Sequence, residues 1–200
     1  MNVNLSGMQL SCSDSEHSSL VIFLRGCPYK CNWCHNKDIT KGTNLLDIEI
    51  IKQYINKQSI IISEIIFSGG EPLCQPAVII ELAKFSNILG LKTGIETSGY
   101  NATVLKYIFE SCIINNIYLD IKTFGKIQYA ELTHNESSWK NVLYAIKICN
   151  KYNIQIHART TIFKEFPDAK TLKHIEHMTK VLDMDWKKQD GNEFPRRVFS

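Results

Sequence analysis

Three of the seven cysteines of this 200-residue chain lie in one short segment, residues 27–34 (CPYKCNWC). Thiolates are the usual protein ligands of iron–sulfur clusters, and three from one loop can hold three irons of a cubane [4Fe–4S] cluster. Because no fourth cysteine belongs to the motif, one iron would stay open to another ligand, which is typical of a reactive metal site. The spacing therefore predicts one cluster, held by Cys27, Cys31 and Cys34.

Two other uses of clustered cysteines are weaker explanations. A zinc site usually has four ligands, in Cys-x2-Cys pairs or with histidines at set spacings. His35 directly follows Cys34, which is poor geometry for chelating the same ion. A disulfide-stapled secreted domain usually has an even number of spaced cysteines. A zinc centre therefore remains an alternative, and a disulfide framework is less favoured still.

The composition is that of an ordinary globular domain, with 44% hydrophobic and 22% charged residues. The formal net charge of +3 is too small to indicate a nucleic-acid-binding surface. Residues 1–19 are polar, and the first apolar run, residues 20–24, is too short for a signal peptide or a membrane span. We expect a protein of the reducing cytoplasm that binds neither nucleic acid nor membrane.

Apolar runs alternate along the chain with stretches of helical periodicity, which predicts βα units and a mainly parallel sheet. A sixth strand could come only from residues 181–188. We expect one domain over residues 1–200 with its core at about 19–185, and with residues 1–18 and the tail 189–200 peripheral. The expected strands are 19–24, 65–67, 91–96, 117–121 and 154–162, and the expected helices are about 46–57, 76–89, 102–114, 139–149 and 168–183.

The chemically notable residues all fall at the carboxyl ends of these expected strands, where parallel βα folds bind their ligands. Taken alone, a Gly-Gly pair is usually a turn and a charged strand end is usually solvated. Their joint occurrence with the cysteine segment favours a single site. The residues concerned are Ser68, Gly69, Gly70, Glu71, Glu96, Thr97, Asp120, Lys122 and Arg159.

The cysteine motif, with Trp33 before its last cysteine, and the motif Gly69-Gly70-Glu71-Pro72 after the next strand together resemble the radical S-adenosylmethionine superfamily. The resemblance covers about residues 19–165. It implies an open, partial β/α barrel of about six parallel strands with outer helices. It also implies two cofactors, one [4Fe–4S] cluster and S-adenosylmethionine, which is reductively cleaved to a radical that abstracts a hydrogen atom.

The resemblance also implies a role for each site residue. Gly69 and Gly70 would let the backbone approach the ligand closely, as residues without a Cβ can. Glu71 would accept from the methionyl ammonium group, and Trp33 would face the adenine. The remaining polar residues, His35, Ser68 and Glu96 among them, would line the same cofactor site. Thr97, Asp120 and Lys122 would contact ribose and carboxylate groups of S-adenosylmethionine, and Arg159 would contact the carboxylate.

Within the superfamily, Cys34-His35-Asn36 and the segment 119–122 (LDIK) resemble the activators of glycyl radical enzymes, most closely those of anaerobic ribonucleotide reductase. The implied partners are that large enzyme and a flavodoxin- or ferredoxin-type electron donor. Glu96 departs from the pattern, because aspartate is more usual there. The alternatives are an activator of pyruvate formate-lyase or another glycyl radical enzyme, a small-molecule enzyme of modified-nucleoside or cofactor synthesis, and a non-catalytic iron–sulfur carrier or zinc module.

Overall fold

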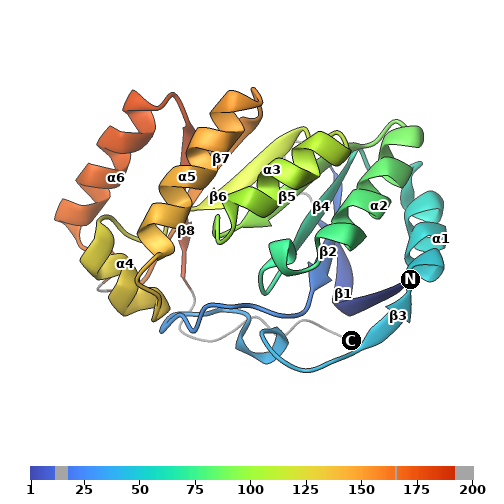
Figure 1. Ribbon diagram of the computed structural model, residues 1–200, viewed down its shortest axis with the longest axis horizontal. Helices are drawn as coiled ribbons and strands as arrows, with labels where there is room; N and C mark the ends of the chain where they lie inside the picture. Colours follow the sequence, from blue (N-terminus) through green and yellow to red (C-terminus); the bar gives the residue numbers. More distant parts are fainter. Residues whose placement is uncertain (12–17, 165, 192–200) are drawn as a thin grey trace.

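The computed structural model describes residues 1–11, 18–164 and 166–191 (Figure 1). Its strands are β1 (Asn2–Ser11), β2 (Ser19–Leu24), β3 (Leu45–Asp47), β4 (Glu64–Gly69), β5 (Lys92–Thr97), β6 (Asn116–Asp120), β7 (Gln155–Ile162) and β8 (Asp185–Asp190). Its α-helices are α1 (Ile48–Gln58), α2 (Pro76–Ile88), α3 (Ala102–Ser111), α4 (Lys126–Thr133), α5 (Ser138–Lys151) and α6 (Ala169–Val181). Short 3₁₀ turns cover Lys37–Ile39 and Pro72–Cys74.

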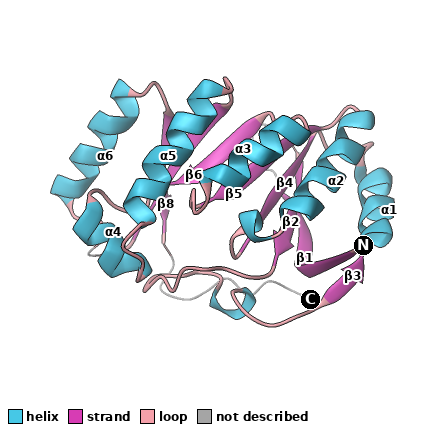
Figure 2. Cartoon of the chain, viewed as in Figure 1, coloured by secondary structure: helices cyan, strands magenta, loops and turns pink. Residues whose placement is uncertain are grey.

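The strands form a single sheet in the order β3-β1-β2-β4-β5-β6-β7-β8. Strands β2, β4, β5, β6, β7 and β8 are parallel, and β1 and β3 are added antiparallel at one edge. The helices lie over one face of the sheet (Figure 2). The expected mainly parallel α/β fold is confirmed, and six parallel strands are present in the described chain.

Local sequence signals explain where several helices begin. Asp47 accepts a hydrogen bond from the backbone of Glu49 at the start of α1, and Asn101 and Asp168 cap α3 and α6 in the same way. Such side chains satisfy the free N–H groups of the first helical turn. These caps help to fix the residue at which each of the three helices begins.

The two faces of the sheet differ in what covers them. Alternate residues of the central strands, such as Ile22, Phe67 and Leu119, pack with the helices in the main hydrophobic core. The residues between them face the opposite side, where Val21, Ile66 and Tyr118 form a second, small cluster. We call this opposite side the inner face, and its carboxyl end carries the site described below.

The sequence predicts residues 1–18 to be peripheral, and for strand β1 this is wrong. β1 pairs with both β2 and β3, and Val3 and Leu5 are buried in the main core. The alternation of residues 2–5 (NVNL) has the period of a half-buried strand and is the signal that could have identified β1.

Helix α4, strand β8 and the C-terminal tail were also compared with the sequence-based predictions. Helix α4 was not predicted, because its residues do not form one apolar stripe and Ile127 is largely exposed. The weakly predicted sixth parallel strand exists as β8, which includes Gln189 and Asp190 from the expected peripheral tail. Residues 192–200 of that tail, and Cys12, lie outside the described residues.

Candidate active site

The cysteine loop leaves the end of β2 and is held by backbone hydrogen bonds on both sides. Gly26 N–H donates to Ile39 and Cys27 N–H to Thr40, so the following 3₁₀ turn supports the first cysteine. On the other side, the N–H groups of Lys30 and Asn32 donate to carbonyls in the last turn of α4 (3.2 and 3.1 Å). Helix α4, which the sequence did not predict, therefore shapes the loop between the first and last cysteines.

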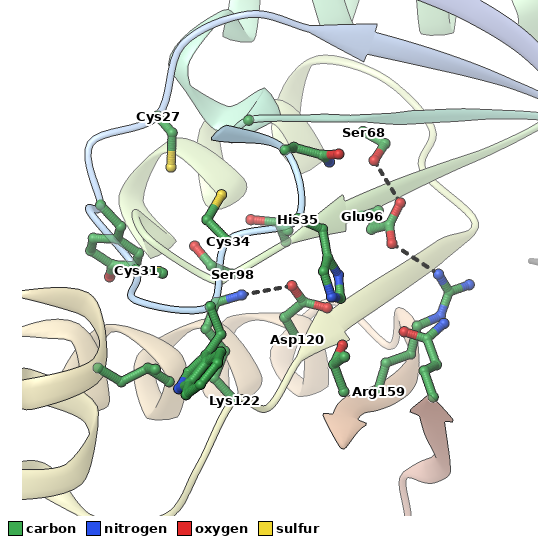
Figure 3. A pocket seen from close by; sticks show the side chains of 18 of the residues that line it. Cys27, Cys31, Cys34, His35, Ser68, Glu96, Ser98, Asp120, Lys122 and Arg159 are labelled. Carbon is green, nitrogen blue, oxygen red and sulfur yellow. Dashed lines mark hydrogen bonds and ion pairs between the residues drawn. The ribbon is translucent and has the colours of Figure 1, made fainter. Parts of the chain in front are cut away.

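A single cavity at the carboxyl ends of the parallel strands brings the expected residues together (Figure 3). It is lined by most of the site residues that the sequence predicts, which come from the cysteine loop and from strands or strand ends β4 to β7. These are Cys27, Cys31, Cys34, Trp33, His35, Ser68, Gly69, Gly70, Glu96, Thr97, Asp120, Lys122 and Arg159. Residues that sequence reasoning missed also line it: Tyr29, Asn36, Ser98, Leu132, Thr161, Phe163, Phe166 and Gln189.

The three thiols are placed where they could hold an iron–sulfur cluster. The Sγ atoms of Cys27 and Cys34 point into the same space (Figure 3), and all three cysteines line the cavity. Among the described residues, no three His, Cys, Asp or Glu side chains are grouped as ligands of one ion. A cubane cluster takes each thiolate on a different iron, so it does not require such a group.

Burial favours the protonated thiols of Cys27 and Cys31 while no metal is bound. Burial raises the pKa of Cys27 to about 12, and it also raises the pKa of Cys31. Iron binding must then displace thiol protons, as is general for cysteine metal sites.

The two glycines after β4 allow the chain to pack against the cysteine loop. At Gly69, where φ is +126°, an added Cβ would lie 2.1 Å from the carbonyl oxygen of Leu24, and at Gly70 it would lie 2.4 Å from that of Gly26. The N–H groups of Gly70 and Glu71 donate to these same two carbonyls (3.0 and 2.8 Å). The glycines line the cavity as expected, but the close approach seen here is to the start of the cysteine loop.

The Glu71 carboxylate is occupied by hydrogen bonds within the chain. Its side chain is only 1% exposed and is not among the lining residues of the cavity. One carboxylate oxygen accepts from Thr97 Oγ1 (2.6 Å) and the other from the backbone and hydroxyl of Ser98. The Glu71 carboxylate thus holds the end of β5, where Thr97 and Ser98 line the cavity. Its contact with the methionyl ammonium group stays a prediction.

Two ion pairs lie at the rim of the cavity (Figure 3). Arg159 donates to Glu96 (Nη1–Oε1, 3.1 Å), and the second carboxylate oxygen of Glu96 accepts from Ser68 Oγ at 2.6 Å. Lys122 pairs with Asp120 (Nζ–Oδ2, 2.8 Å). Each cation of the rim thus has an acidic neighbour in the chain itself.

The backbone of Lys122 is held by a hydrogen bond to helix α4. Its backbone N–H donates to the hydroxyl of Tyr129 (2.9 Å), a side chain that is almost fully buried. Burial alone would lower the pKa of Lys122, but the negative charge of Asp120 outweighs it and the pKa lies above its usual value. Lys122 therefore stays cationic beside the cysteines.

One wall of the cavity is aromatic. The indole of Trp33 stacks on Phe163 with ring centres 5.2 Å apart and planes 27° apart, and His35 contacts the same ring. Trp33 remains 54% exposed. The position of Phe163 just after β7 was the signal that could have added it to the site. Cys74, which lies near Glu71 in the chain, is exposed and does not line the cavity.

Comparison with known proteins agrees with this geometry. A family described as the radical SAM superfamily matches residues 21–178. The chain belongs to the radical SAM superfamily. The matched region runs from β2 to α6 and contains the cysteine loop and all the predicted site residues.

Three curated relatives show how this superfamily member compares in sequence. A Methanocaldococcus jannaschii protein provisionally named as a glycyl-radical enzyme activating enzyme is 29% identical over 84% of this chain and 70% of its own length. The pyruvate formate-lyase-activating enzyme of Clostridium pasteurianum is 26% identical over 80% of this chain and 72% of its own. The 7-carboxy-7-deazaguanine synthase of M. jannaschii is 27% identical over 72% and 64%.

A solved structure, Streptococcus suis SuiB bound to the precursor peptide SuiA, has the same fold with a TM-score of 0.69 and 16% identity. The match covers 86% of this chain and 39% of SuiB, so the chain spans about two fifths of that protein. At this identity the likeness concerns the fold, and it supports the partial barrel.

Members of the radical SAM superfamily use a [4Fe–4S] cluster and S-adenosylmethionine, and the donor set here fits both. Three partly buried thiols, with no fourth cysteine among the described residues that line the cavity, can hold three irons and leave one open. The remaining rim combines carboxylates, cations, hydroxyls and an aromatic wall, which suits a zwitterionic ligand that carries a purine. Membership of the superfamily therefore favours an iron–sulfur cluster over a zinc centre at these cysteines.

Proposed function

We propose that this protein activates a glycyl radical enzyme, most specifically an anaerobic ribonucleotide reductase. The cluster would supply the electron that cleaves S-adenosylmethionine, which allows abstraction of a hydrogen atom from a glycine of the partner. The observation that carries the proposal is the similarity to two activating enzymes over at least 80% of this chain. The segments Cys34-His35-Asn36 and 119–122 support the narrower choice of reductase.

In this proposal the chain's own residues bind and orient the cofactors. Cys27, Cys31 and Cys34 hold the cluster, and Trp33 with Phe163 provides the aromatic surface for the adenine. Glu96 and Arg159 on one side of the cavity, and Asp120 and Lys122 on the other, address polar groups of S-adenosylmethionine. The other cofactor contacts come from His35, Ser68, Thr97 and the backbone of Gly69 and Gly70.

The accessible edge of the inner face at β7 and β8 supports a macromolecular substrate. The helices cover the opposite face of the sheet (Figure 1), and at β7 and β8 the inner-face side chains of His157 and Asp185 are 30% and 44% exposed. A glycine carried on a protein loop could therefore approach the cavity from this side.

In the described residues, no helix is long and apolar enough to cross a membrane. We infer that the protein works in the cytoplasm with a flavodoxin- or ferredoxin-type donor.

The test mixes reduced protein, S-adenosylmethionine and a candidate anaerobic ribonucleotide reductase without oxygen and records the electron paramagnetic resonance spectrum. We expect a glycyl doublet on the reductase. The Cys31→Ser protein, and a reductase whose radical glycine is replaced by alanine, are the matched controls and should give no doublet. A doublet only with a pyruvate formate-lyase-type partner would move the assignment to that enzyme. Turnover of a small molecule with no protein radical would overturn it in favour of a biosynthetic enzyme.

A further inference from the structure

Below the rim of the cavity, the inner face contains a buried aromatic ring that the proposed function does not use. Tyr118, from the middle of β6, is only 3% exposed. The guanidinium of Arg159 lies 4.2 Å from the centre of this ring and ends at Glu96 on the rim. Because Arg159 is on β7 and Glu96 is on β5, the guanidinium side chain crosses β6, and the ring of Tyr118 is the surface that it crosses.

The hydroxyl end of the Tyr118 ring is held by a hydrogen bond that spans strand β5. The hydroxyl of Tyr118 donates to Glu64 Oε2 at 3.0 Å, and Asn116 also donates to Glu64, at 2.8 Å. β5 lies between β4 and β6, and at this level it carries Gly94. A Cβ on Gly94 would lie 2.8 Å from Tyr118 Cε2 and 2.9 Å from Glu64 Oε1. The absence of a side chain at Gly94 is therefore what lets the ring reach Glu64.

A second ring packs beside the first. The imidazole of His157 stacks on Tyr118 with ring centres 5.1 Å apart and planes 23° apart. Tyr118 is thus held by Glu64 at its hydroxyl and by His157 at its ring, while Arg159 lies over it.

An arginine side chain loses considerable rotamer freedom when it is ordered around a ligand. A fixed aromatic surface removes much of that cost beforehand and adds a cation–π attraction. We propose that Tyr118, anchored on Glu64 across Gly94, is a positioning residue that holds the Arg159 guanidinium at the rim for an anionic group of the bound ligand. Because the proposed function makes S-adenosylmethionine that ligand, its carboxylate is the group concerned.

The first experiment is calorimetry of S-adenosylmethionine binding to the cluster-loaded chain without any partner protein. Tyr118→Leu should weaken binding about tenfold, within the range of a desolvated cation–π contact. Tyr118→Phe keeps the ring but removes the hydroxyl that is anchored on Glu64, so its affinity should lie between those of the wild type and Tyr118→Leu. Phe23→Leu removes an aromatic ring from the same small cluster, and as the matched control it should leave the affinity unchanged.

The second experiment repeats the substitution in an Arg159→Met background. If Tyr118 acts through Arg159, Tyr118→Leu should weaken binding no further there, since the two substitutions remove one shared effect. An equal loss of affinity in both backgrounds would overturn the proposal and mark a general structural role.

If Tyr118→Leu does not fold, Gly94→Ala provides an independent variant, because its Cβ displaces the ring without removing it. It should weaken binding in the wild-type background and not in the Arg159→Met background, and any other pattern rejects the proposal. A wild-type chain that does not bind S-adenosylmethionine would overturn both this proposal and the proposed function. Binding without radical transfer to a partner would overturn only the assignment of the partner.

Discussion

Glu71 and the two glycines before it make contacts within the chain at the edge of the cavity. The carboxylate of Glu71 is buried and accepts from Thr97 and Ser98, while Gly69 and Gly70 allow the turn after β4 to contact the cysteine loop. The motif therefore joins three strand ends into one rim. Substitutions there should alter the stability of the protein even when no cofactor is bound.

Replacing Glu71 by alanine should lower the free energy of unfolding by roughly 2–4 kcal/mol, since each buried donor left without an acceptor costs roughly 1–3 kcal/mol. Urea unfolding of the cluster-free chain measures this difference. Glu176 is exposed on α6, and Glu176→Ala is the control that should change little. An unchanged stability of the Glu71→Ala protein would show that Thr97 and Ser98 find other acceptors.

The same carboxyl group should make stability depend on pH. Burial raises the pKa of Glu71, although hydrogen bonds from Ser98 and Thr97 oppose the shift. A carboxyl whose pKa is raised in the folded state stabilises the fold most below its unfolded pKa and loses that contribution as pH rises. The stability of the wild type relative to Glu71→Gln should therefore fall as pH increases above 4.5. Denaturant unfolding at a series of pH values tests this, and a difference that grows with pH would contradict it.

Gly69→Ala should destabilise the protein by roughly 3 kcal/mol or more, because backbone strain and overpacking each cost roughly 1–3 kcal/mol. Gly90 is the matched control, since its φ is +76° but a Cβ there would meet nothing within 4 Å. Gly90→Ala should therefore show the strain without the collision. Equal unfolding midpoints for the two variants would mean that the contact with Leu24 relaxes at little cost.

At the scale of elements, α4 joins the cysteine loop to the end of β6. Its last carbonyls accept from Lys30 and Asn32, and its Tyr129 hydroxyl accepts from Lys122. A side-chain contact of 2.7 Å between His134, just after the helix, and Asn32 adds to this connection. The loop is therefore held by protein contacts before any iron is bound.

Hydrogen exchange of the cluster-free chain should show the amides of Lys30 and Asn32 protected, because backbone hydrogen bonds must open before exchange. Tyr129→Ala should remove this protection, since loss of a buried aromatic side chain costs roughly 3–5 kcal/mol. Tyr107 lies exposed on α3, and Tyr107→Ala should leave the loop unchanged. A cysteine loop that exchanges freely in the wild type would contradict the support by α4.

At the scale of the whole molecule, the hydrophobic core forms away from the cluster. One continuous core runs from Val3 on β1 to Met184 just before β8 and joins the helices to the sheet. This differs from small zinc domains, whose folding depends on the metal. We therefore expect the chain to fold before it receives its cofactors.

Removal of iron should leave the far-ultraviolet circular dichroism and a cooperative unfolding transition in place. Reconstituted protein should contain about four irons per chain, as one thiolate-bound cubane requires. Replacing all three of Cys27, Cys31 and Cys34 by serine should abolish iron binding, while Cys112→Ala should retain it. An iron-free chain that is unfolded, or a triple variant that keeps its cluster, would contradict this account.

Local information in the chain was enough to predict the βα series, the cysteine loop and the strand ends that line the cavity. Close spacing identifies the cysteines, and apolar periodicity identifies strands and amphipathic helices without knowledge of their neighbours. Parallel strands also share one carboxyl edge, so residues as distant as Ser68 and Arg159 could be assigned to one site.

The tertiary structure alone decided which of these residues face the cavity and which support it. The Glu71 carboxylate is buried because the end of strand β5 places two hydroxyl groups against it. The Tyr118 hydroxyl reaches Glu64 because Gly94, which has no side chain, lies between them in the sheet. α4 has no apolar stripe, and it is ordered by its contacts with the cysteine loop and α5. Such pairings depend on strand register and side-chain packing between distant segments, and no pattern within a single segment encodes them.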